Sequence, residues 1–402
     1  MIISKSFKYR LRLTPEQESL CRQTAGSCRY VWNRALALKK EAWEKNKQRI
    51  SRFGLDNLLT EWKKELDWLT LPPSQSLQQV NKDLDQAFKN FFSGRGYPRF
   101  KKKGINDSFR LPQGITLTEQ LSKKVGQVQL PKLGIVRFTK TREINGRIKH
   151  VTISKSCKNW LISFNCEVDM PPPKEIPQSH IGIDRGITTF AQCSNREAIP
   201  SISPLKKNLK RLAKLQRQLS RRKRFSSNWR KTKQRIQKLH YHIANLRGDF
   251  LHKASTQLAK SHSLIVMEDL KTKDMAKSAK GTKESPGTNV KAKSSLNRSI
   301  LDQGWHTFQN YLSYKLNWRG ARLILIPPKN TSLECRICHH ISKENRISQE
   351  VFQCQNCGHT ENAHLNASIN ILAAGHAVIA CGVEALASTA KQELLIRRPA
   401  MV

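Results

Sequence analysis

Four cysteines near the end of the sequence form its most specific chemical pattern. They are Cys335, Cys338, Cys354 and Cys357, with the spacing C-x2-C-x15-C-x2-C. We call each C-x2-C pair a knuckle. Two knuckles can present four thiolates to one zinc ion in tetrahedral geometry and leave no coordination position open. We therefore predict a structural zinc site, with disulfide pairing as the weaker alternative. Three histidines lie nearby, His339, His340 and His359, and we expect that none of them is a metal ligand.

Two carboxylates stand alone at the ends of hydrophobic segments. Asp184 closes the segment HIGID, and Glu268 closes LIVME. Burying a carboxylate there costs several kcal/mol unless a cation or hydrogen-bond donors compensate. One interpretation is a divalent metal site, because such oxygen ligands suit Mg²⁺ or Mn²⁺ and a two-ion site of that kind hydrolyses phosphodiesters. The other interpretation is a pair of acids that cap nearby helices.

The segments around these acids predict an α/β domain from residue 178 onward. Its order is strand, helices, strand, helix, strand. Ser203 is the predicted N-cap of a helix that begins at Pro204, and a later helix is expected to bury Leu301, Trp305 and other apolar residues. Leucines and isoleucines predict buried seams on the two helices of residues 204–246. These positions are Leu205, Leu209, Leu212, Leu215, Leu219, Ile236, Leu239, Ile243 and Leu246. Residues 271–298 lack aromatic side chains and predict a mobile basic loop.

The first 170 residues predict a different organisation. Apolar and charged side chains alternate over residues 7–13, which indicates a strand. Thr14, followed by Pro15 and Gln17, predicts a helix start with a capping box, and helical pattern continues to about residue 92. From about 107 to 170, five or six short strands suggest a small barrel, and the proline-rich segment 170–178 marks a domain boundary.

The charge balance points to a polyanionic partner. The 402 residues include 72 Lys and Arg against 30 Asp and Glu, a formal net charge of +42. No acidic residue lies between Glu197 and Asp249, a segment rich in lysine and arginine. Nucleic acid fits this pattern, because each phosphate that the protein neutralises releases counterions. No signal peptide or membrane-spanning run is expected, and the remaining cysteines suit a reducing compartment.

Several motifs together resemble one family. They are YRLRLTPEQ, CRYVWNRAL, GYPRFKKK, GIDRGITTFA, LIVMEDL, LNRSILDQGW, YKLNWRG, TSLEC and NASINILAAG, and they cover most of the chain in order. The sequence resembles TnpB, also called OrfB, the transposon-encoded RNA-guided nucleases related to type V CRISPR effectors. The resemblance implies a multidomain α/β protein whose RNase-H-like (RuvC) domain carries an inserted zinc ribbon and follows a small wedge-type β-barrel with an inserted helical recognition lobe.

The resemblance also implies domain limits. The wedge-type barrel would comprise residues 1–13 and 95–172, and the recognition lobe residues 14–94. The RuvC-like domain would comprise residues 178–330 and 361–385, the zinc ribbon residues 331–360, and an unassigned tail residues 386–402. In this family a guide RNA from the transposon end pairs with double-stranded target DNA beside a short motif that the protein reads.

His364 departs from the family pattern. The family carries its three RuvC acids in a GIDxG strand, an xxEDL strand and an ENADxNAA stretch; Asp184 and Glu268 match the first two. The third stretch here is ENAHLNAS, so His364 replaces the expected aspartate. An imidazole is a poorer Mg²⁺ ligand than a carboxylate, so we expect impaired cleavage that Mn²⁺ partly rescues. Glu361 could substitute only if the helix began early enough to carry it.

The sequence thus predicts a TnpB-like, RNA-guided DNA-binding protein with weakened metal-dependent cleavage. Its expected cofactors are structural Zn²⁺ and catalytic Mg²⁺ or Mn²⁺, and its expected partners are guide RNA and target DNA, with no membrane. A bacterial cytoplasmic, nucleoid-associated location follows from this prediction. Two alternatives stay open: a nuclease-inactive guided repressor, and a general basic RNA-binding protein without a guide.

Overall fold

The structure is a computed structural model, and it describes residues 1–122, 124–171 and 177–381. The chain divides into two compact units, one from Met1 to Met170 and one that begins at Pro171. We call them the N-terminal unit and the C-terminal unit, and describe each by itself. The predicted tail of residues 386–402 lies outside the described residues.

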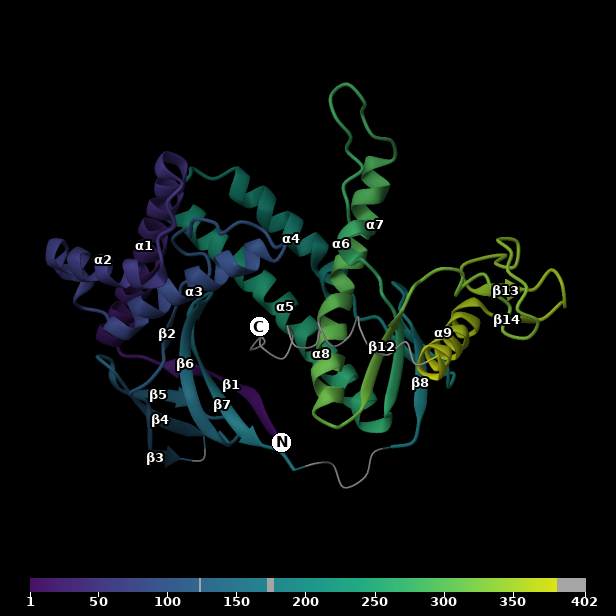
Figure 1. Ribbon diagram of the computed structural model, residues 1–402. Coiled ribbons are helices and arrows are strands. Elements are labelled where there is room, and N and C mark those ends of the chain that lie inside the picture. Colours follow the sequence, from purple (N-terminus) through teal and green to yellow (C-terminus); the bar gives the residue numbers. More distant parts are fainter. Residues whose placement is uncertain (123, 172–176, 382–402) are drawn as a thin grey trace. The chain divides into compact units, whose positions relative to one another are not determined.

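The N-terminal unit combines helices with one antiparallel sheet (Figure 1). Its helices are α1 (Pro15–Asn46), α2 (Arg52–Glu65), the 3-10 turn η1 (Asp67–Leu69) and α3 (Ser74–Phe92). Its strands are β1 (Ile2–Arg12), β2 (Ser108–Leu111), β3 (Thr116–Ser122), β4 (Val125–Leu130), β5 (Gly134–Thr139), β6 (Arg147–Ser156) and β7 (Asn159–Asp169). The strand order is β2-β6-β7-β1-β5-β4-β3. Closure of this sheet into a barrel stays a prediction.

Local sequence explains how this unit starts. Phe7, Tyr9 and Leu11 are buried on one face of β1, as their alternation with cations predicted. The capping box at Thr14 is confirmed, because its hydroxyl accepts from the Gln17 backbone N–H at 3.2 Å and the Gln17 side chain accepts from the Thr14 N–H. Helices and sheet share a single apolar core.

The C-terminal unit is built on a five-stranded sheet with the order β10-β9-β8-β11-β12. Its strands are β8 (His180–Asp184), β9 (Thr189–Cys193), β10 (Ala198–Pro200), β11 (Leu264–Glu268) and β12 (Arg322–Ile326), with the separate ribbon β13 (Val351–Gln353) and β14 (Thr360–Asn362). Its helices are α4 (Pro204–Ser220), α5 (Ser227–Ser261), α6 (Thr272–Met275), α7 (Val290–Gln303), α8 (Trp305–Asn317) and α9 (Ala363–Ala380). Strands β8, β11 and β12 are parallel, whereas β9 is antiparallel to β8.

The two faces of this sheet bury different helices. Alternate residues such as Ile183 and Met267 share a core with α5 and α8. Intervening residues such as Val266 face α9, which lies beside β8 in Figure 1. The contact with α9 is close because Gly182 lacks a side chain: a Cβ there would lie 2.1 Å from the carbonyl oxygen of Ser368. Residues 182 and 184 therefore share the face that α9 covers.

Predictions about the helices of this unit were confirmed only in part. Ser203 is the N-cap residue of α4, as predicted, but its side chain makes no capping hydrogen bond; instead Asp302 of α7 accepts from the backbone N–H groups of Leu205 and Lys206. The expected continuous helix breaks at Gly304, whose φ of 70° ends α7, and this break leaves Leu301 59% exposed. Residues 271–298 do not form a continuous loop, because they contain α6 and the start of α7.

The apolar seams of α4 and α5 are confirmed in part. Leu212, Leu239 and Ile243 form a small buried cluster, with Leu205, Leu215 and Ile236 partly buried against it. Leu246 is 41% exposed, contrary to the prediction. The cluster holds α4 against α5, so the two helices form a hairpin with a core of its own (Figure 1).

Candidate functional site

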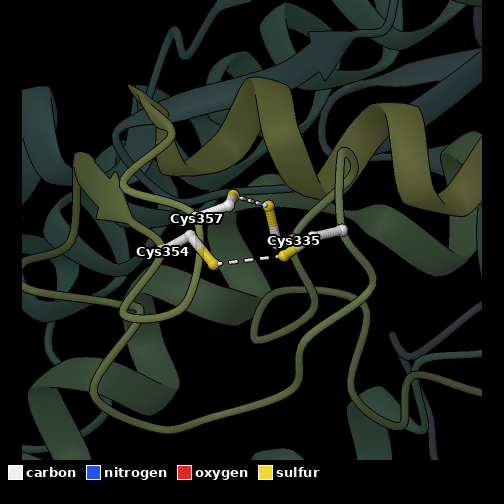
Figure 2. Close-up of side chains that lie close together, drawn as sticks. Cys335, Cys354 and Cys357 are labelled. Atoms are coloured by element: carbon white, nitrogen blue, oxygen red, sulfur yellow. Dashed lines mark hydrogen bonds between the residues drawn. The ribbon is translucent and has the colours of Figure 1, made fainter.

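The four cysteines of the two knuckles converge on one point. Figure 2 shows Cys335, Cys354 and Cys357 directed toward one another. All four Sγ atoms lie within 4.8 Å of one another, with 3.7 Å between Cys335 and Cys357 and 3.5 Å between Cys338 and Cys354. Thiolates around a tetrahedral ion with metal–sulfur bonds of about 2.3 Å stand at about this separation. All four are free thiols, so the disulfide alternative fails.

Two of the three neighbouring histidines lie beside carboxylates. His339 Nδ1 lies 2.8 Å from Glu334 Oε1, and His359 Nε2 lies 3.5 Å from Glu361 Oε2. Within the described ranges, the only group of His, Cys, Asp and Glu side chains close enough to hold a metal by geometry is the four cysteines. The metal-binding set at the knuckles is therefore purely sulfur.

Asp184 and Glu268 end neighbouring parallel strands. Ile183 pairs with Met267 across β8 and β11, so the two acids follow at the same edge of the sheet. His364 reaches this edge from the first turn of α9, where its Nδ1 lies 2.7 Å from Asp184 Oδ2. Asn362 fixes that turn, because its side-chain oxygen accepts from the backbone N–H groups of His364 and Leu365.

Glu268 is held in a partly buried setting. Burial raises the pKa of its carboxyl, a hydrogen bond from Thr331 opposes that rise, and the nearby charge of Asp184 adds to it. Thr331 Oγ1 donates to Glu268 Oε1 at 2.6 Å. A buried carboxyl whose pKa is raised by a neighbouring acid is a setting in which a bound cation is favourable.

Arg185 is a further member of the site that sequence reasoning missed. Its side chain is only 5% exposed, and its Nη2 donates to the backbone carbonyl of Glu268. Burial lowers the pKa of the guanidinium to about 10, against the opposing effect of Glu268, Asp184 and Asp269. The one available signal was its position directly after Asp184 in the sequence. Arg185 places a buried positive charge beside the two acids.

Glu361 does not take the place of the missing aspartate. It lies on β14, before α9 begins at Ala363. Its two carboxylate oxygens accept from Nε and Nη2 of Arg336, at 2.6 Å and 3.2 Å. His364 is therefore the residue that α9 contributes to the acids.

A set of buried polar contacts joins the cysteine knuckles to this site. Asn366 and Asn370 of α9 both donate to the backbone carbonyl of Glu334, each at 2.7 Å. Asn370 also donates to the carbonyl of Thr331 at 3.1 Å, and Thr331 in turn donates to Glu268. Because Glu334 directly precedes Cys335, one loop contacts the metal-binding cysteines, the helix of His364 and the carboxyl of Glu268.

Known families match three parts of the chain. Residues 163–279 match a family described as "Probable transposase", and residues 305–371 match "Cas12f1-like, TNB domain". Residues 1–48 match a "Helix-turn-helix domain", and in this structure they contain strand β1 and the single helix α1. Among the described residues, no helix is both long enough and apolar enough to span a membrane.

Similar proteins agree with these matches. The chain is 48% identical, over 94% of both chains, to the "Putative RNA-guided DNA endonuclease InsQ" of Escherichia coli K12. It is 32% identical, over 94% of its length and 91% of the relative, to a "Putative RNA-guided DNA endonuclease" of Streptomyces pristinaespiralis. Its fold resembles the protein in a cryo-EM structure of a Cas12f1–sgRNA–target DNA complex, with a TM-score of 0.56, 15% identity and coverage of 92% and 98%. The chain therefore belongs to the TnpB-like family of RNA-guided DNA endonucleases.

Proposed function

We propose that this protein binds a guide RNA and uses it to cleave matching double-stranded DNA. The observation that carries the proposal is the convergence of Asp184, Glu268 and His364 at one edge of the five-stranded sheet. Similarity over nearly the whole length of an RNA-guided endonuclease supports the same activity. A net charge of +42 supplies the electrostatic attraction that both nucleic-acid partners require.

The domain assignment belongs to this proposal. The C-terminal sheet, with the parallel strands β8, β11 and β12 and the antiparallel pairs β8–β9 and β9–β10, belongs to the RuvC-like nuclease domain, and residues 331–360 are its zinc ribbon. The N-terminal sheet is the wedge-type barrel, and α1 to α3 form the recognition lobe. The four-thiolate geometry favours Zn²⁺ as the ion of the ribbon.

Asp184 and Glu268 would hold the divalent ion of the nuclease site. Their carboxylates fit such an ion, since two acids lie close enough to interact, and the charges of Arg185 and Arg346 lower the pKa of Glu268 less than its burial raises it. When bound, Mg²⁺ or Mn²⁺ supplies Lewis-acid chemistry for phosphodiester hydrolysis. Thr331 orients Glu268 through its hydrogen bond, and Asn362 orients His364 by capping α9.

His364 is the residue that limits the reaction. With Nδ1 as donor to Asp184, its imidazole keeps a lone pair on Nε2, which is a softer ligand than a carboxylate oxygen. The contact also occupies one oxygen of Asp184. The histidine lacks the negative charge of the expected aspartate. We therefore expect the protein with His364 to cleave about 10²- to 10³-fold more slowly than one with aspartate at this position.

The test compares wild type with His364→Asp on a plasmid that carries a guide-matched target, in Mg²⁺ and in Mn²⁺. The expected result is slow cleavage by the wild type, faster in Mn²⁺, and a marked increase in the Mg²⁺ rate for His364→Asp. Asp184→Ala is the control and should abolish cleavage. Rapid Mg²⁺ cleavage by the wild type that His364→Asp does not raise would contradict the role given to His364. Absence of both guided binding and cleavage in every variant would contradict the function itself.

The two alternatives receive less support. The substitution at His364 is compatible with a nuclease-inactive repressor, but two relatives similar over nearly the whole chain carry the name "Putative RNA-guided DNA endonuclease". A general RNA-binding protein would need neither the converging acids nor the cysteine knuckles.

A further inference from the structure

The tip of the α4–α5 hairpin carries two aromatic side chains among cations. Phe225 lies in the connection between the helices and is 60% exposed, and Trp229 lies on the first turn of α5. We propose that this tip stacks against an unpaired or terminal nucleobase, with Phe225 as the main contact. The inference rests on the proposed function in assuming a nucleic-acid partner, but it assigns a contact that guided cleavage does not require.

The backbone at Phe225 is held in an unusual conformation. Its φ of 67° lies in the left-handed region, which is rare for a bulky residue. Burial does not compensate for this conformation, because most of the ring is in solvent. The ring contacts Trp229, with the centroids 5.5 Å apart and the planes at 60°. Stability alone would favour glycine or asparagine at this position.

One cation lies near each of the rings of Phe225 and Trp229. The Arg224 guanidinium lies 4.9 Å from the centroid of Phe225, and Lys233 Nζ lies 5.0 Å from that of Trp229. Residues 221–233, RRKRFSSNWRKTK, contain seven lysines and arginines and no acid. The positive charge favours an anionic partner, and the exposed ring of Phe225 favours one that offers flat faces. Nucleic acid combines phosphates with bases, each of which has a π-face for stacking.

The tip is fixed before any partner arrives. Ser226 caps α5 by accepting from the Trp229 backbone N–H at 3.2 Å. Arg222 Nη1 donates to the carbonyl of Asn228 at 2.5 Å and to the hydroxyl of Thr232, which is fully buried. These contacts join the end of α4 to the first turns of α5, so little conformational entropy is lost when the rings bind.

The experiment uses full-length protein and three 2-aminopurine-labelled probes: single-stranded RNA, single-stranded DNA and blunt duplex DNA. Phe225→Gly removes the ring and suits the left-handed backbone, whereas Phe225→Tyr keeps an aromatic ring. We expect Phe225→Gly to bind at least one probe about 5- to 150-fold more weakly and to lose quenching of the probe. Its unfolding temperature and its salt dependence of binding should match the wild type, since no charge changes. Phe225→Tyr should behave as wild type, and the probe affected identifies RNA or DNA as the source of the base.

Three outcomes would overturn the inference. The first is equal binding and quenching of every probe by wild type and Phe225→Gly. The second is a loss of thermal stability in Phe225→Gly that accounts for its weaker binding, because the ring would then serve the hairpin. The third is ring-dependent binding to vesicles of phosphatidylcholine and phosphatidylglycerol without ring-dependent binding to any probe. Guided plasmid cleavage, measured in parallel, separates these outcomes from failure of the proposed function, since ring-dependent quenching could persist without cleavage.

Discussion

At the scale of single residues, the meeting of Asp184 and His364 depends on a glycine that takes no part in chemistry. Gly182 lies two residues before Asp184 on β8 and faces α9. A Cβ at this position would lie 2.1 Å from the carbonyl oxygen of Ser368 and 2.7 Å from the backbone nitrogen of Leu372. Both obstacles belong to the backbone of α9, so a side chain could be accommodated only if the helix moved.

Gly182→Ala should therefore destabilise the protein and separate His364 from Asp184. We expect a loss of unfolding free energy of about 3 kcal/mol, at the upper end of the usual cost of overpacking. Thermal denaturation and plasmid cleavage measure the two effects. Gly248→Ala in α5 is the matched control, because a Cβ there meets nothing within 4 Å and alanine should stabilise the helix by about 0.5–1 kcal/mol. Equal unfolding temperatures for the two variants would refute this account of Gly182.

Residues differ in how far the sequence could predict them. Asp184 and Glu268 were predicted because a carboxylate at the end of an apolar strand is a local pattern. Thr331 could not be predicted, since it lies in a loop 63 residues after Glu268 and only the folded chain brings them together. Glu361 shows the converse: it is near His364 in sequence, but its bidentate pairing with Arg336 commits it elsewhere.

At the scale of elements, hydrogen bonds join α9 to the loop that leads into the cysteine knuckles. Asn366 and Asn370 are buried and fasten α9 to the loop that enters the first knuckle. Removing zinc should therefore disturb the acids as well as the ribbon. Zinc is removed with a chelator, and the chelator is then removed. We expect the resulting protein to bind Mn²⁺ at least about tenfold more weakly than the untreated protein. Electron paramagnetic resonance of free Mn²⁺ measures this affinity.

Asn370→Ala should reproduce part of that loss while zinc stays bound, because it removes the donor to the Thr331 carbonyl and one of the two donors to the Glu334 carbonyl. Gln349→Ala, at an exposed position between the two cysteine pairs, is the control and should bind Mn²⁺ as wild type does. The coupling would be disproved by unchanged Mn²⁺ affinity in the zinc-free protein.

The helices show where element prediction failed and why. The start of α4 was predicted correctly at Pro204, but its cap comes from Asp302, a contact over nearly a hundred residues. The break between α7 and α8 follows from the positive φ of Gly304, and a glycine within an apolar pattern leaves that outcome open. Hydrophobic periodicity and capping residues in the sequence identify the helices, whereas contacts between distant residues determine how the helix ends are capped.

At the scale of the whole molecule, charge should control affinity. The protein has 72 basic and 30 acidic residues, so we expect it to contact many phosphates when it binds nucleic acid. We expect affinity for duplex DNA to fall by at least about 10³-fold between about 50 and 200 mM NaCl, as for proteins that contact 6–10 phosphates. Fluorescence anisotropy gives the dissociation constants, and sucrose at equal osmolarity is the control. A change below tenfold would mean that most of the charge lies away from the nucleic acid.

The position of α9 in the chain has a consequence for biosynthesis. It follows the four cysteines and is the last helix among the described residues, so a ribosome synthesises it after all four cysteines. The asparagines of α9 bind the loop that the metal organises, and the same helix delivers His364 to Asp184. The folding of the cysteine loops and the placement of His364 beside Asp184 are therefore expected to occur as one cooperative event.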